Sequence, residues 1–232
     1  MAEDEISRNR ERLPSVRTGA VILLATTILS GLAGCSSSGN KSPAGVAAGR
    51  VCDSSLDAKA AASLDRISGV STYDELPGKN DFGEPNKFSL ARATAHLGTT
   101  LSQRTKCTGY RASDDSGYPL LDITFRRTSY YTNKSNLSRY ERSYHTFYPI
   151  GLYADTGKRD SASLYFSCPA KQKNAPKYVT ARMYTASDQL AVSDTSKARM
   201  TILNSAARSM ARALGCSSES GLPANVPSGT LG

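Results

Sequence analysis

The chain has 232 residues, a formal net charge of +9 and a mean hydropathy of -0.39. This length allows one domain or two small ones, and the hydropathy excludes a polytopic membrane protein. An apolar content of 39% with 21% charged residues fits a folded globular protein and excludes collagen-like, coiled-coil and wholly disordered classes. The five cysteines are an odd number, so at least one of them has a role other than an intramolecular disulfide.

The first 34 residues have the pattern of a secretory signal peptide, in which four arginines precede an uncharged run over residues 19–31. These 13 residues are too few for a transmembrane helix, which needs about 20 apolar residues, but they fit a signal-peptide apolar region. The sequence Leu32-Ala-Gly-Cys35 then resembles the lipobox of bacterial lipoproteins. The resemblance implies cleavage before Cys35, lipid on its thiol, and anchoring at the extracytoplasmic face of the cell membrane. The alternative is an ordinary thiol after an ordinary signal peptide.

Segments poor in apolar residues flank the predicted domain. Residues 35–50 are small and polar, which predicts a flexible tether. Residues 217–232 are rich in Ser, Gly and Pro, which predicts a disordered tail. The predicted folded unit is therefore a single domain over residues 51–216.

Four cysteines lie in that unit: Cys52, Cys107, Cys168 and Cys216. In an exported chain an even set of cysteines predicts two disulfides. The alternative is a metal site, but zinc frameworks bring their ligands in close pairs, whereas the nearest two cysteines here are 48 residues apart. We therefore expect disulfides and no metal.

Two helices are predicted after Cys52. Apolar residues recur at helical spacing over residues 56–67, with Ser54 or Ser55 as the N-cap and Gly69 after the end. The same spacing over residues 90–101 predicts a second helix that ends near Cys107. If the two helices form an antiparallel hairpin, Cys52 lies near Cys107, which favours that disulfide.

The middle of the chain alternates apolar and polar residues with the period of a strand. Residues 155–160 are predicted as a turn because they include Asp, Thr, Gly and charged side chains. The sheet is predicted to have four or five antiparallel strands, within residues 108–112, 121–126, 144–150, 162–168 and 179–183.

A long amphipathic helix is predicted to follow, with Asp194 or Thr195 as its cap and Gly215 at its end. If it returns across the sheet, its end lies beside Cys168, which favours a disulfide to Cys216. The expected inward residues are Ile202, Leu203, Ala206, Ala207, Met210, Ala213 and Leu214, with Arg199, Arg208 and Arg212 elsewhere.

Helices segregated from an antiparallel sheet make an α+β domain. The lipobox, the Ser/Gly tether, the strand ending at Cys168 and the final helix ending at Cys216 together resemble small actinobacterial lipoproteins of unknown function. This resemblance implies a location in the cell envelope and no particular activity.

Charge is uneven along the chain, since residues 126–232 carry 15 basic and 6 acidic side chains while residues 45–125 carry 9 and 10. Guanidinium groups beside tyrosines bind phosphates and carboxylates, so an anionic-ligand site is a hypothesis for the basic region. The alternative is a solvated face that favours solubility. The candidate site residues are Arg126, Arg127, Arg139, Arg142, Tyr140 and Tyr144.

No catalytic motif of the common hydrolase, metalloprotease or phosphate-loop types is present. Of the two histidines, His96 is expected on the surface of a helix, and His145 lies among tyrosines, where a strand residue is expected more than a catalytic base. The favoured function is a non-catalytic binding domain without a cofactor, whose partners are the membrane and an anionic envelope polymer or an envelope protein rather than nucleic acid. The alternative is a small envelope hydrolase with its site in the Tyr-rich basic region.

Overall fold

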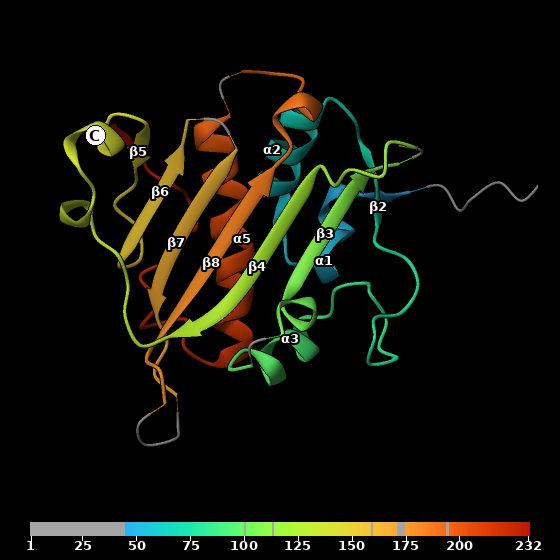
Figure 1. Ribbon diagram of the computed structural model, residues 1–232, viewed down its shortest axis with the longest axis horizontal. Coiled ribbons are helices and arrows are strands. Elements are labelled where there is room, and N and C mark those ends of the chain that lie inside the picture. The colour runs from blue at the N-terminus through green and yellow to red at the C-terminus, as the bar shows by residue number, and fades with distance from the viewer. Residues whose placement is uncertain (1–44, 100, 113, 159, 171–174, 194) are drawn as a thin grey trace, which may run out of the picture. The chain divides into compact units, whose positions relative to one another are not determined.

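The computed structural model describes residues 45–232 except residues 100, 113, 159, 171–174 and 194 (Figure 1). Cys35, the predicted signal peptide and most of the predicted tether lie outside the described residues. Over the described part the chain is an α+β domain, as predicted, with one antiparallel sheet of nine strands. The strands are β1 (Val46–Ala47), β2 (Thr72–Glu75), β3 (Lys106–Arg111), β4 (Leu121–Thr128), β5 (His145–Phe147), β6 (Tyr153–Gly157), β7 (Ser161–Ser167), β8 (Tyr178–Thr185) and β9 (Thr230–Leu231).

Five α-helices belong to the described residues, and two of them are single turns. They are α1 (Val51–Ser54), α2 (Ala58–Ser68), α3 (Leu90–His96), α4 (Arg139–Arg142) and α5 (Ser196–Leu214). Short 3-10 helices lie at Ala48–Arg50, Ser102–Arg104, Lys134–Asn136 and Ser187–Gln189.

The strand order is β1-β2-β3-β4-β8-β7-β6-β5-β9. Two groups of consecutive strands, β1 to β4 and β5 to β8, meet where β4 pairs with β8 along eight residues of each strand. The chain therefore leaves the sheet centre after β4, returns at β5 near one edge, and works back to the centre (Figure 1). This topology makes β4, β8 and β7 the middle of the sheet.

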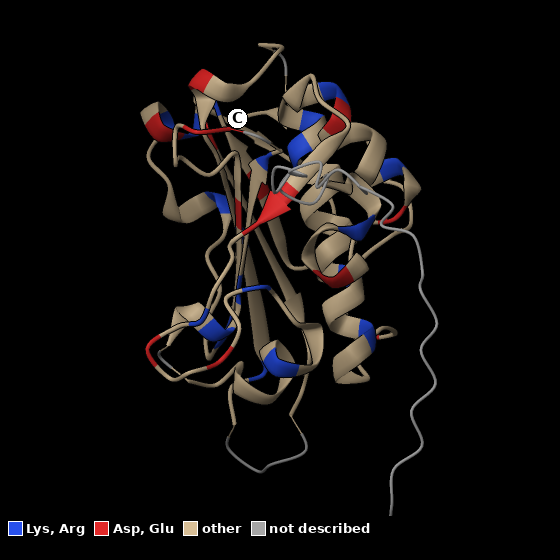
Figure 2. Ribbon diagram, turned by 90° about the vertical axis from the view of Figure 1, so that its right-hand side faces the viewer, with Lys and Arg blue, Asp and Glu red and all other residues tan. Residues whose placement is uncertain are grey.

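The long helices α2 and α5 pack on the same side of the sheet (Figure 2). Alternate residues of the central strands point towards them, and Leu121, Ile123 and Phe125 are each at most 3% exposed. Helix α5 contributes Ile202, Leu203 and the residues one turn further on, so its apolar stripe meets the apolar side of the strands. One core fills this interface, and it fixes which side chains face away.

The strand count differs from the prediction because four strands carry weak sequence signals. Strands β1 and β9 have two residues each, and β2 lies before a Pro- and Gly-rich loop. The predicted turn at residues 155–160 is wrong in its first half, because Asp155 to Gly157 continue strand β6. Asp155 and Thr156 can lie in this buried strand because each side chain has a polar partner. The Asp155 carboxylate contacts the His145 imidazole, and the Thr156 hydroxyl contacts the Ser196 hydroxyl.

The helix layout also differs. Asp57, rather than Ser54 or Ser55, caps α2 by accepting hydrogen bonds from the Lys59 and Ala60 amides, while Gly69 ends the helix in a left-handed conformation, as predicted. Helix α3 ends at His96, so the chain is not helical as far as residue 101. Cys107 lies within strand β3 and not near a helix end.

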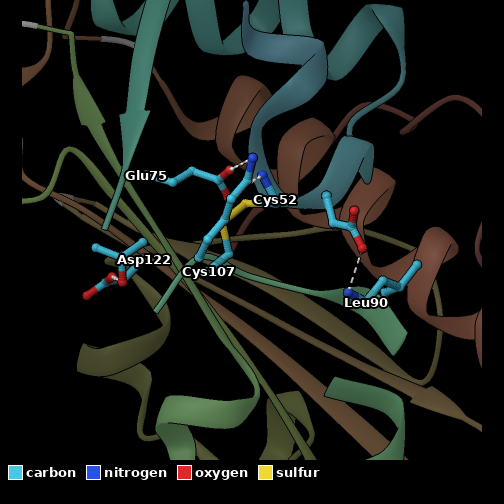
Figure 3. The surroundings of a disulfide bond; sticks show 8 residues. Cys52, Glu75, Leu90, Cys107 and Asp122 are labelled. Carbon is cyan, nitrogen blue, oxygen red and sulfur yellow. Dashed lines mark hydrogen bonds and ion pairs between the residues drawn. A yellow bond between two sulfur atoms is a disulfide. The ribbon is translucent and has the colours of Figure 1, made fainter. Parts of the chain in front are cut away.

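Both predicted disulfides, Cys52–Cys107 and Cys168–Cys216, are confirmed. The first forms for a different reason than a helical hairpin, because the turn α1 places Cys52 against β3 (Figure 3). Cys52, Asp53 and Ser54 all have positive φ. Non-glycine residues pay about 1–2 kcal/mol each for this left-handed conformation.

Two carboxylates hold this turn in addition to the disulfide. Glu75 accepts a hydrogen bond from the Cys52 amide at 3.0 Å, and Asp53 accepts one from the Leu90 amide at 2.8 Å (Figure 3). Burial raises the pKa of the Glu75 carboxyl, although the hydrogen bond from Cys52 and the charge of Lys87 oppose this effect. The turn is therefore a strained segment held by a covalent bond and two acidic side chains.

The predicted disordered tail is wrong, because residues 217–232 lie along the domain. The Asn204 side chain donates to the Pro223 carbonyl at 2.8 Å, Val226 is buried, and β9 pairs with β5. Residues 45–50 likewise belong to the fold, since β1 pairs with β2 and Ala48 is buried. Composition predicted disorder here, but backbone pairing and a few buried side chains hold both segments.

Helix α5 ends at the left-handed Gly215, as predicted. Thr195 precedes its first residue, but the Thr195 side chain makes no capping hydrogen bond, and Asp194 lies outside the described residues. The expected inward face needs two corrections. Ala213 is exposed, while Arg199 is 1% exposed. The Arg199 guanidinium donates to the carbonyls of Ser161 at 2.8 Å and Gly157 at 2.7 Å. A long cation is buried here because it reaches the two carbonyls that bracket the turn between β6 and β7.

Candidate functional site

The side of the sheet that faces away from α2 and α5 carries polar and aromatic side chains. The register of β7, β8 and β4 places Ser161, Tyr184 and Asp122 in one row across the strands, and Ser163, Arg182 and Thr124 in the next row. Because residues alternate between the two sides of a strand, these six side chains share what we call the open face.

A shallow hollow of about 360 Å³ lies over these two rows. Its lining residues are Asp122, Thr124, Ser161, Ala162, Ser163, Arg182, Met183 and Tyr184. Arg182 is an exposed residue whose guanidinium donates to the Tyr165 hydroxyl at 3.2 Å. Its charge also lowers the pKa of the neighbouring Asp155 carboxyl. One hydrogen-bond partner leaves most of the five N–H donors of Arg182 available to a ligand.

Three hydroxyl groups surround Arg182 in the hollow. Those of Ser161, Ser163 and Thr124 have no hydrogen-bond partner among the described residues. A hydroxyl both donates and accepts, and a guanidinium donates in a planar fork that matches a carboxylate or phosphate. The hollow therefore suits a ligand that combines an anionic group with hydroxyls.

Two neighbouring contacts fix the walls of the hollow. Asp122 accepts a hydrogen bond from the Thr108 hydroxyl at 2.6 Å and lies 3.6 Å from the Lys106 ammonium, so its charge is compensated within the protein. On the opposite side, a Cβ at residue 157 would lie only 2.6 Å from the Ser161 hydroxyl oxygen, so Gly157 leaves the room that this hydroxyl needs. The Arg199 guanidinium holds the carbonyls of both residues from the core side.

A carboxylate–imidazole pair lies beside the hollow. Asp155 pairs across the strands with Ser163, and its carboxylate contacts Nδ1 of His145. Burial raises the pKa of the Asp155 carboxyl above its ordinary value, while its hydrogen bond to His145 opposes this shift. The imidazole is partly exposed, whereas the carboxylate side chain is only 6% exposed. The sequence pointed to His145 but placed Asp155 in a turn, and thus missed the pair.

The structure does not bring the six predicted anionic-ligand residues together. Arg126 and Arg127 lie on β4, whereas Arg139, Arg142, Tyr140 and Tyr144 lie on or after α4, which packs beside β5. Four strand spacings separate β4 from β5 in the sheet, which is about 19 Å. Their closeness in sequence therefore does not make one patch in space.

Several of these predicted residues have structural contacts. Arg127 faces the core side and donates to the carbonyls of Cys168 and Pro176, and burial lowers the pKa of its guanidinium. Arg142 donates to the Leu137 carbonyl, and the rings of Tyr140 and Tyr144 pack edge to face with their hydroxyls hydrogen-bonded. Arg126, by contrast, is exposed on the open face.

A second hollow of about 420 Å³ lies at the end of β3 that carries Arg111. Its main polar side chains are hydrogen-bonded within the protein. Arg111 donates to the carbonyls of Ser68 and Gln189. The Gln189 amide in turn donates to acceptors in the loop of residues 114–118. We therefore assign the candidate site to the open face.

The sequence reasoning missed Arg182, Ser161 and Ser163. The available signal was the polar side of each strand, since the residues that alternate with the core positions of β4, β7 and β8 are Asp, Thr, Ser, Arg and Tyr. No pattern in the sequence shows that these three strands are neighbours, and only the pairing of β4 with β8 brings them together.

No known protein family, curated protein or solved structure matches this chain. In the part of the chain that the structure describes, no helix is both long and apolar enough to cross a membrane. Within the same residues, no group of three His, Cys, Asp or Glu side chains is placed to hold a metal ion.

Proposed function

We propose that this protein is a lipid-anchored cell-envelope protein whose domain binds an anionic envelope polymer at the open face. The anchor rests on the lipobox-like sequence ending in Cys35 and on the signal-peptide pattern before it. Two disulfides support export, because such bonds persist in oxidising compartments. On this proposal the domain lies outside the cytoplasmic membrane, where nucleic acid is not its expected partner.

The binding role rests on one observation, the exposed Arg182 guanidinium among three hydroxyls that lack protein partners. Surface side chains that serve only solubility do not need to converge on a hollow, whereas a ligand site gathers a few polar groups with free hydrogen-bonding capacity. The site thus moves from the basic region predicted from sequence to the centre of the sheet. The anionic polymer expected from the sequence remains the ligand, and the hydroxyls of the hollow add a preference for a polymer with hydroxyl groups.

The binding test uses the purified full chain in detergent and three immobilised polymers. These are polygalacturonate, which carries carboxylates, poly(glycerol phosphate), which carries phosphates, and neutral dextran. We expect retention on one or both anionic polymers at low salt, a decrease as salt rises, and none on dextran. Vesicles with anionic lipids form a fourth arm that distinguishes a polymer from a lipid headgroup.

Arg182→Gln is the decisive variant, and Arg212→Gln on the exposed end of α5 is its charge-matched control. A hydrogen bond to a charged group contributes about 1.5–3 kcal/mol, so we expect the first variant to weaken binding about tenfold or more. The control variant and Arg139→Gln should bind like the wild type. Unchanged binding by Arg182→Gln, or no retention of the wild type at low salt, would refute the site.

The anchor has a separate test in a bacterial host. Labelled palmitate should enter the wild-type protein and not Cys35→Ala, and the variant should leave the membrane fraction. Label that persists in Cys35→Ala would contradict lipidation at this residue, whatever the outcome of the polymer experiments.

A hydrolase is the second candidate, and the contact between Asp155 and His145 Nδ1 favours it. In that role the carboxylate orients the imidazole, and the other ring nitrogen accepts a proton from an attacking water molecule. The test is the release of reducing ends from polygalacturonate by the wild type and by His145→Ala. No release by the wild type, or equal release by both, would exclude this role for His145 on this polymer.

A further inference from the structure

The open face extends beyond the hollow along strand β8. Its outward residues are, in order, Tyr184, Arg182, Thr180 and Tyr178, and Arg126 of β4 lies opposite Thr180. We call these five residues the β8 stripe. Tyr184 is 48% exposed, and Arg182 and Arg126 are exposed as well. The stripe thus has an aromatic residue at each end and two cations between them.

The two ends of the stripe are far apart. Six residues of extended strand separate Tyr184 from Tyr178, which is about 20 Å. Tyr178 packs edge to face against Tyr131, with ring centroids 5.1 Å apart, so the second end is a fixed aromatic pair. A small molecule in the hollow beside Tyr184 does not reach this pair, but an extended chain does.

A buried hydroxyl lies beside the two cations. Thr180 is 8% exposed, and its hydroxyl has no hydrogen-bond partner among the described residues. A buried polar group without a partner costs free energy, and such groups commonly mark a bound water or ligand. Thr180 lies opposite Arg126 on β4 and two residues from Arg182 on β8, so its hydroxyl adjoins both cations.

We propose that the β8 stripe binds an extended segment of an acidic polysaccharide, so that the ligand spans from Tyr184 to the pair Tyr178–Tyr131. This inference rests on the proposed function and deepens it, because it names the ligand as a chain of sugars rather than a single anionic group. Arg182 and Arg126 bind acidic groups on different sugar units, and the hydroxyls around them bind sugar hydroxyls.

The composition of the stripe favours this occupant. Aromatic faces carry negative charge density that attracts the polarised C–H groups of a sugar ring, and tyrosine adds a hydroxyl at its tip. A duplex nucleic acid would need many cations along its path, whereas the stripe has two. The free hydroxyls of Ser161, Ser163 and Thr124 match a ligand with many hydroxyl groups of its own.

The test measures affinity against ligand length, with oligogalacturonides from the dimer to the octamer and the full chain in detergent. Affinity should rise about tenfold or more from the dimer to the length that spans the stripe, and then become constant. Arg126→Gln and Tyr178→Ala should weaken binding of the octamer and leave the dimer unchanged. Tyr140→Ala, an exposed tyrosine on α4, is the matched control and should bind like the wild type.

Equal affinity for dimer and octamer would overturn the inference, as would octamer binding that is unchanged in both Arg126→Gln and Tyr178→Ala. If Arg182→Gln still weakens dimer binding in that case, the proposed function stands and only the extended mode fails. A polyglutamate peptide or a single-stranded oligonucleotide of similar length that binds more tightly than the octamer would show that the occupant is wrong.

Discussion

The two faces of the sheet differ in the side chains that the same strands place on them. In β4, Ile123 is fully buried against the helices, while its neighbour Thr124 lines the hollow on the open face. In β7 the same alternation separates Phe166 from Ser163. The covered face is filled with apolar side chains. The open face carries a small second apolar cluster of Phe147, Tyr153 and Tyr165 and, beside it, hydroxyls of Ser161, Ser163 and Thr124 that have no hydrogen-bond partner among the described residues.

Within a single strand, the residues of the covered face should therefore determine stability, and the residues of the open face should determine binding. A change on the covered face removes packing, so it should lower the free energy of unfolding. A change on the open face should alter binding and leave that free energy nearly unchanged. The following predictions test this separation, starting with the largest expected effect.

Loss of the disulfide that ties the end of β7 to the end of α5 should have the largest effect. The double variant Cys168→Ala with Cys216→Ala removes a cross-link between residues separated by 48 positions. In the chain-entropy model, this loss lowers the free energy of unfolding by about 4 kcal/mol. The matched pair Cys52→Ala with Cys107→Ala should cost less, because it also releases the strained turn at residues 52–54. Urea unfolding of both variants measures the difference, and an equal or larger loss for the Cys52 pair would contradict the effect of strain.

Ile123→Ala and Thr124→Ala form the direct comparison of the two faces. The first should lower the free energy of unfolding by about 2–5 kcal/mol, because it opens a cavity in the core. The second should change it by at most about 0.5 kcal/mol and should weaken polygalacturonate binding. Urea unfolding and retention on the polymer measure the two effects. A large loss of stability in Thr124→Ala, or weaker binding in a folded Ile123→Ala, would show that the two faces do not have separate roles.

Arg199→Met should break the separation, because Arg199 lies on the core side but holds residues next to the hollow. It leaves the carbonyls of Gly157 and Ser161 without their charged donor, which should cost about 2–4 kcal/mol. It should also weaken binding at pH and temperature where the variant is fully folded. Arg212→Met on the exposed end of α5 is the control, and a binding affinity unchanged in Arg199→Met would confine its role to stability.

Glu75→Gln tests the acidic side chain that holds the strained turn. Burial raises the pKa of this carboxyl in the folded state, so its ionisation opposes folding, and stability from this group is lost as pH rises through that pKa. The variant keeps an oxygen acceptor for the Cys52 amide but has no charge. Between pH 4 and pH 7, we expect the variant to lose less stability than the wild type. Thermal unfolding of both proteins across this pH range measures the loss. The same dependence of stability on pH in both proteins would contradict the prediction.

Ser163→Ala should have the smallest effect on stability. Its hydroxyl has no hydrogen-bond partner among the described residues, so the free energy of unfolding should change by at most about 0.5 kcal/mol. Binding of polygalacturonate should nevertheless weaken. Ser71→Ala, at an exposed serine just before β2, is the control for binding to the hollow.

Local patterns were sufficient for several parts of the fold. The alternation in residues 121–126 and 162–168 predicted strands with the correct sides, and the helical spacing after Thr195 predicted α5. Gly69 and Gly215 marked helix ends because each needs a left-handed conformation that glycine adopts without strain. The compartment argument predicted that the four cysteines form two disulfides, while the expected layout of helices and strands favoured the observed pairing.

Other elements were not predictable from local patterns. Strand β6 contains Asp155, Thr156 and Gly157, whose residue types are typical of a turn. They form a strand because His145 and Ser196, from elsewhere in the chain, bind the side chains of Asp155 and Thr156. Residues 217–232 have a composition typical of disorder, yet pairing of β9 with β5 holds their end. Contacts between residues distant in sequence override local propensity in both cases.

The sequence by itself determined the α+β class and the sides of the central strands, and it predicts lipid attachment at Cys35. The tertiary structure alone decided which polar side chains lie together, because it pairs β4 with β8 and places β5, beside which α4 packs, four strand spacings from β4. The physical reason is that periodicity records which side of a strand a residue occupies. The neighbours of that strand depend on the packing of the whole core.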